Sequence, residues 1–90
     1  MITIKTALII QNQEVVTSAI LDLKGKWAGW ILKDTIGWQG LLSTEPIYDS
    51  FHEAIRAMDN VVKMIRDLDL SEHTKELKNI MNGAQDIWKK

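Results

Sequence analysis

The sequence predicts an α+β protein: a four-stranded antiparallel meander sheet followed by two amphipathic α-helices, in the order ββββαα. Before Pro46 the apolar residues recur mostly at every second position, which is the spacing of strands. After Pro46 they recur at every third or fourth position, which is the spacing of one helix face. With 90 residues the chain is predicted to be a single domain, with residues 1–45 as the sheet part and residues 46–90 as the helical part.

Four segments before Pro46 are predicted to be strands. Residues 2–10 alternate, with large aliphatic side chains at most even positions, and a polar turn follows them. Residues 15–23 alternate again; they would also make an acceptable helical stripe, and we favour a strand because β-branched residues are dense there. Residues 27–33 and 38–43 complete the meander, joined by a short loop that ends at a glycine able to adopt a positive φ.

Two segments after Pro46 are predicted to be helices. The first covers residues 50–67 and starts with Ser50, followed three positions later by Glu53, which fits a capping box. Its apolar stripe extends over about five turns: Phe51, Ala54, Ile55, Met58, Val61, Val62, Ile65 and Leu68. The second covers residues 71–88, because the phase of the first stripe breaks near Asp69 and a new stripe begins after it.

Composition narrows the possible functions. The formal net charge is -1, which argues against a strong electrostatic binder of nucleic acid or membrane surfaces. Cysteine is absent, so we expect no disulfide framework and no thiolate zinc site. No stretch approaches the length of a membrane-spanning helix, and the N-terminus lacks the pattern of a secretory signal, so we expect a cytoplasmic protein.

Residues suited to catalysis or metal binding do not converge in the sequence. His52 and His73 each lie near the start of a predicted helix and lack further ligands at metal-binding spacing. Ser50 is explained by helix capping, and Asp67 and Asp69 by the turn between the two predicted helices. We therefore predict no enzymatic activity, no catalytic residues, no metal site and no cofactor.

Tryptophan is the distinctive residue type, with three of the four tryptophans in the last two predicted strands. Alternation places Trp30 and Trp38 on the face that the helices are expected to cover. Trp27 falls on the opposite face, together with large apolar residues from the other strands. This second face is the predicted interaction surface, with the residues Ile9, Val16, Ile20, Trp27, Ile31, Lys33 and Leu41.

So many apolar residues on one sheet face are too many for a free monomer. Either the second predicted helix crosses to that face or a second subunit covers it, with that helix packed in its own chain or exchanged between subunits; because the loop before the helix is short for the crossing, we expect a homodimer or a larger homo-oligomer. The predicted function is a small non-enzymatic protein-interaction module, such as a regulator, adaptor or inhibitor, that also binds another protein. The alternative is a nucleic-acid-associated regulator acting through lysine and tryptophan on a sheet face. Its candidate residues are Lys5, Lys24, Lys26, Lys33 and Trp27.

One segment is similar to a known type of small module. A hairpin leads through residues 48–54, with the sequence YDSFHEA, into an amphipathic helix. This arrangement resembles the ββα or βββα modules of the HicB-type antitoxins and the YegP-like proteins. The similar segment covers fewer than half of the residues, and the proline and glycine pattern of the antitoxin sheet is absent, so no family is assigned.

Overall fold

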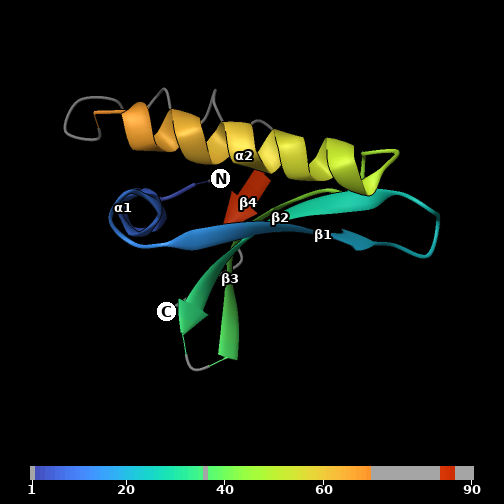
Figure 1. Cartoon of the computed structure of the whole chain (residues 1–90), viewed down its shortest axis with the longest axis horizontal. Coiled ribbons are helices and arrows are strands. Elements are labelled where there is room, and N and C mark those ends of the chain that lie inside the picture. Colours follow the sequence, from blue (N-terminus) through green and yellow to red (C-terminus); the bar gives the residue numbers. More distant parts are fainter. Residues whose placement is uncertain (1, 36, 70–83, 87–90) are drawn as a thin grey trace.

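The fold is a sheet with its helices on one side (Figure 1). The computed structural model describes residues 2–35, 37–69 and 84–86. In chain order the elements are α1 (Ile4–Asn12), β1 (Val15–Leu21), β2 (Trp27–Thr35), β3 (Gly37–Thr44), α2 (Phe51–Asp67) and β4 (Ala84–Asp86). The strands are ordered β1-β2-β3-β4, and all neighbours are antiparallel. Helix α2 packs along β1 and β2, and α1 packs against α2.

The α+β class and the central part of the predicted topology are confirmed. Strands β1, β2 and β3 form an antiparallel meander within or close to the three ranges expected, and α2 matches the first predicted helix. The prediction for residues 2–10 was wrong, because they lie in and next to α1 instead of a strand. The second predicted helix, residues 71–88, falls mostly outside the described residues; its described part, Ala84–Asp86, is the strand β4.

Helix α1 begins with a threonine N-cap, which the alternation of apolar and polar residues in the sequence did not indicate. The Thr3 hydroxyl accepts a hydrogen bond from the backbone N–H of Thr6 at 3.1 Å, which satisfies a donor that the first helical turn leaves open. Three residues with helical spacing, Thr6, Ala7 and Ile10, are buried on one side. The β-branched residues of this segment favour a strand. However, the buried residues of the segment also recur at helical spacing, so they form one buried stripe when the segment is a helix.

The C-terminal ends of α1 and α2 cap each other. The Gln11 side-chain amide donates to the backbone carbonyls of Ile65 and Leu68, at 2.7 Å each. In return, Arg66 of α2 donates from Nε to the carbonyl of Ile10 and from Nη2 to that of Gln13. The last carbonyls of a helix lack partners within the helix, so these four bonds stabilise both ends together.

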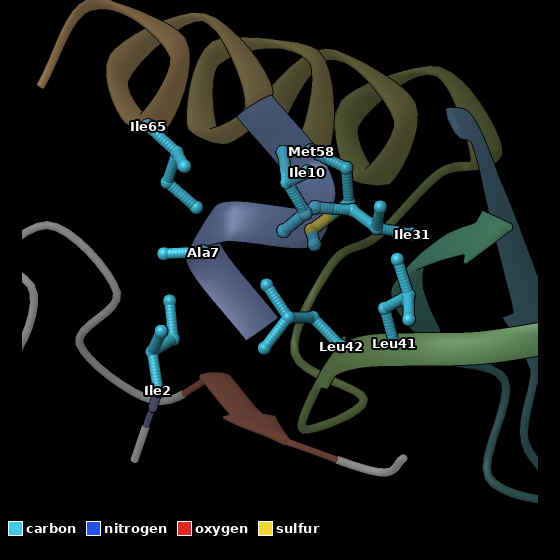
Figure 2. Packing of buried hydrophobic residues seen from close by; sticks show 8 residues of the cluster. All are labelled: Ile2, Ala7, Ile10, Ile31, Leu41, Leu42, Met58 and Ile65. Carbon is cyan, nitrogen blue, oxygen red and sulfur yellow. The ribbon is translucent and has the colours of Figure 1, made fainter. Parts of the chain in front are cut away.

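A β-bulge lets two successive leucines enter the core. Between Ile31 and Leu32 the register shifts, so that Leu42 pairs with Ile31, Gly40 pairs with Leu32, and Leu41 is the extra residue. Both Leu41 and Leu42 are fully buried, although strict alternation would place them on opposite faces. Figure 2 shows the cluster that they join: Ile2, Ala7, Ile10, Ile31, Leu41, Leu42, Met58 and Ile65.

The serine cap at the start of α2 supports a first prediction; the Glu53 carboxylate accepts from Asp49 instead of from Ser50, so the reciprocal half of the predicted capping box is shifted by one residue. The Ser50 hydroxyl accepts from the N–H of Glu53 at 3.1 Å, and the Glu53 carboxylate accepts from the N–H of Asp49 at 3.2 Å. Replacing Ser50 with alanine is expected to lower the free energy of unfolding by about 1 kcal/mol, measured by urea denaturation. Ser50→Asp preserves the acceptor and should remain close to the parent protein; an equal loss in both variants would contradict the capping role.

Candidate functional site

Three contacts identify the face of the sheet that the helices cover. The ring of Trp27 meets Phe51 of α2 edge to face, with 5.4 Å between ring centroids. Gly29 lies directly beneath Met58 and the backbone carbonyl of Ala54, and Ile31 is fully buried. The odd-numbered residues of β2 therefore face the helices. On β1 the hydroxyl of Thr17 donates to the carboxylate of Asp59 at 2.6 Å, so its odd-numbered residues face α2 as well.

The opposite side of β1, β2 and β3 is the open face. Cross-strand pairs define its members, because directly opposed residues of antiparallel strands share a face. Val16 pairs with Leu32, and Trp30 pairs with both Ser18 and Ser43. The open face comprises Val16, Ser18, Ile20, Ala28, Trp30, Leu32, Asp34, Trp38, Gly40 and Ser43. None of the described helices lies on this side of the sheet (Figure 1).

Large apolar side chains on the open face are accessible to a partner. The exposed fraction is 44% for Val16, 52% for Ile20 and 60% for Trp38, while Trp30 and Leu32 are half-buried. These residues extend across all three strands of the open face. An apolar surface with exposed tryptophan is suited to burying area against another macromolecule.

A small cavity of about 310 Å³ lies where one end of the open face meets the helix layer. Its lining residues are Glu14, Val15, Val16, Asp34, Trp38 and Arg66. Val16 and Trp38 belong to both the cavity and the open face, whereas Glu14, Asp34 and Arg66 add charges of both signs. The Arg66 guanidinium already donates hydrogen bonds to the carbonyls of Ile10 and Gln13. The cavity therefore provides a polar rim next to an apolar surface, which is the usual composition of a protein contact.

The seven residues of the predicted interaction surface do not share one face. Val16 and Ile20 lie on the open face, whereas Trp27, Ile31 and Lys33 lie on the helix side of β2. Leu41 is in the core through the β-bulge, and Ile9 belongs to α1, where it packs against the core.

Alternation in the sequence assigned the residues of β2 to two faces correctly. The face that was predicted to lie under the helices is the open face, and the face that was predicted to be open lies under the helices. Trp30 and Trp38 were expected beneath the helices, and both belong to the open face. Gly29 is a signal for the helix side of β2, because a glycine in a strand often marks a place where another segment approaches closely.

The five residues of the nucleic-acid alternative are also dispersed. Lys5 is in α1, and Lys24 and Lys26 are in or next to the turn between β1 and β2. The Lys26 ammonium binds the Asp49 carboxylate, and this hydrogen bond, followed by the charge of Asp49, raises the pKa of Lys26. Lys33 and Trp27 lie on the helix side of β2. No common lysine and tryptophan platform is formed by these residues.

The described residues contain no group of three or more histidine, aspartate or glutamate side chains placed to hold a metal ion. No helix in the described part of the chain is long and apolar enough to cross a membrane. Comparison with known proteins finds no matching family model, no similar curated protein and no similar solved structure.

Proposed function

We propose that this protein is a small non-enzymatic interaction module that binds protein through the open face. One observation supports the proposal above all: Val16, Ile20 and Trp38 are about half exposed on one continuous sheet face. An apolar surface of this kind loses its unfavourable contact with water when a partner covers it. The role is that of a regulator, adaptor or inhibitor, and the absence of cysteine suits the reducing cytoplasm.

Trp38 is the proposed energetic centre of the contact. Its indole is 60% exposed, and it adjoins both the apolar strands and the charged rim of the cavity. Tryptophan is over-represented among the residues that contribute most to protein binding, because one rigid side chain buries a large area. A protein partner is favoured over nucleic acid because the open face is apolar and the five candidate nucleic-acid-binding residues are dispersed.

The proposal is tested by capturing partners from the source cells with the immobilised chain and repeating the capture with Trp38→Lys. We expect Trp38→Lys to weaken binding of a specific partner by about 30-fold, corresponding to roughly 2 kcal/mol. Met64→Lys is the matched control, because Met64 is 46% exposed on α2, in the opposite layer. It should leave the interaction unchanged.

Two outcomes would contradict the proposal. A partner that is lost with Met64→Lys and retained with Trp38→Lys would place the interaction on the helix layer. Binding of oligonucleotides at low salt that collapses as salt rises would favour the nucleic-acid alternative, because phosphate contacts release counterions.

A further inference from the structure

Strand β1 is an edge strand without the usual protection. It is the first strand in the sheet order, and its seven residues, VVTSAIL, include no charged residue and no proline. Its pairing with β2 is regular over the whole strand, without a bulge. Edge strands normally carry lysine, proline or a bulge that prevents pairing with another chain. β1 has none of these devices.

The outward backbone groups of β1 can be identified from the turn that follows it. The N–H of Asp22 donates to the carbonyl of Lys26, so this pair is hydrogen-bonded. The next pair, Leu21 and Trp27, is not hydrogen-bonded, because the N–H and the C=O of Trp27 both bond to Tyr48 instead. Hydrogen-bonded pairs alternate along an antiparallel ladder. The outward N–H and C=O groups therefore belong to Val15, Thr17, Ala19 and Leu21.

No backbone partner satisfies these outward groups within the described part of the chain. Among the described residues, the backbone hydrogen bonds of β1 extend to β2, and a further bond joins the Thr17 side chain to Asp59. The strand thus presents seven residues of extended backbone, ready to accept another strand.

We propose that β1 pairs with β1 of a second copy, antiparallel, about a two-fold axis through Ser18. This proposal names a second copy of the chain as one partner of the interaction module. It rests on the proposed function only in treating the protein as such a module. It would join the two sheets into one continuous sheet and place the two open faces side by side. The second copy is the proposed occupant because an uncharged strand is complementary to itself under two-fold symmetry.

The register follows from the outward groups. Centring the axis on Ser18 pairs Thr17 with Ala19 of the second copy and Val15 with Leu21, so all four outward residues form hydrogen bonds. On the open face the same register opposes Val16 to Ile20 of the second copy. This is a non-hydrogen-bonded pair, in which side chains approach most closely. Val16, Ile20 and Leu21, which are 44%, 52% and 51% exposed, all become covered.

A charge-swap experiment at the axis tests this arrangement. Light scattering should give twice the mass of one chain for the unmodified protein at micromolar concentration. Ser18→Lys and Ser18→Asp each place two like charges next to each other, so each variant alone should be a monomer. Mixing the two variants should restore a dimer that contains one chain of each kind, because the charges across the axis are then opposite.

Ser43→Lys is the matched control, since Ser43 is half-buried on the same open face but lies on β3. Pairing through β1 predicts that Ser43→Lys remains dimeric. A monomeric parent protein, or a mixture of Ser18 variants that fails to pair, would overturn the proposal. A dimer that dissociates with Ser43→Lys and survives Ser18→Lys would also overturn it, in favour of face-to-face contact. A monomeric parent protein that still loses its partner with Trp38→Lys would leave the proposed function intact.

Discussion

Replacing Ile10 with alanine is expected to lower the free energy of unfolding by about 2–5 kcal/mol. Ile10 is fully buried in the core cluster, where α1 meets α2 and the sheet (Figure 2). Truncation removes buried methyl and methylene groups and leaves a cavity that the neighbouring side chains fill only in part. Because a domain of this size has a total stability of roughly 5–15 kcal/mol, the loss would be large enough for urea denaturation to measure reliably.

Leu8→Ala is the matched control for this prediction. Leu8 lies two residues earlier in the same helix and is 45% exposed. Its truncation should change the stability by no more than about 0.5 kcal/mol, and alanine favours the helix. In a strand, Leu8 and Ile10 would lie on the same face and would show similar losses. Comparable effects of the two substitutions would therefore contradict the helical assignment of residues 4–12.

Replacing Gly29 with alanine is expected to destabilise the protein by about 1–3 kcal/mol, because the added methyl group has no room. A β-carbon at this position would lie 2.5 Å from Cγ of Met58 and 3.2 Å from the carbonyl oxygen of Ala54. Either the Met58 side chain must rearrange or α2 must move away from the sheet. Urea denaturation followed by circular dichroism would measure the loss.

A double-mutant cycle with Met58→Ala isolates the cause. Met58 is fully buried, so Met58→Ala alone should cost about 2–5 kcal/mol. When both substitutions are combined, the space left by the methionine accommodates the new methyl group. The combined loss should then be smaller than the sum of the single losses by at least about 0.5 kcal/mol. Additive losses would show that the effect of Gly29→Ala does not arise from contact with Met58.

Local sequence determined the helices and strands whose cap, turn and periodicity residues all lie close together in the chain. Helix α2 is one example: Ser50 and Glu53 form its cap, and a long 3.6-residue stripe follows. The central strands are another, because they are β-rich segments separated by turn residues, with Gly25 and Gly37 both at φ 84°. In each case backbone sterics and neighbouring side chains are sufficient to select the conformation.

Tertiary contacts decided the conformation of the N-terminal segment. Residues 4–12 can satisfy a strand pattern or a helix pattern, and a helix of nine residues is marginal when isolated. The helix becomes stable where α2 covers its buried stripe and where Gln11 and Arg66 exchange hydrogen bonds between the two C-terminal ends. Those partners lie more than fifty residues away in sequence, beyond the range of a local pattern.

Tertiary structure also decided which sheet face remains open. Both faces of β2 carry apolar residues, so alternation correctly grouped Trp27 with Ile31 and Trp30 with Leu32 but could not choose between the groups. Helix α2 lies on the side of Gly29, where the missing side chain leaves room for the buried Met58 and for the backbone carbonyl of Ala54. The amino-acid sequence by itself determined the two sets of side chains, and close packing between distant segments determined which set faces outward.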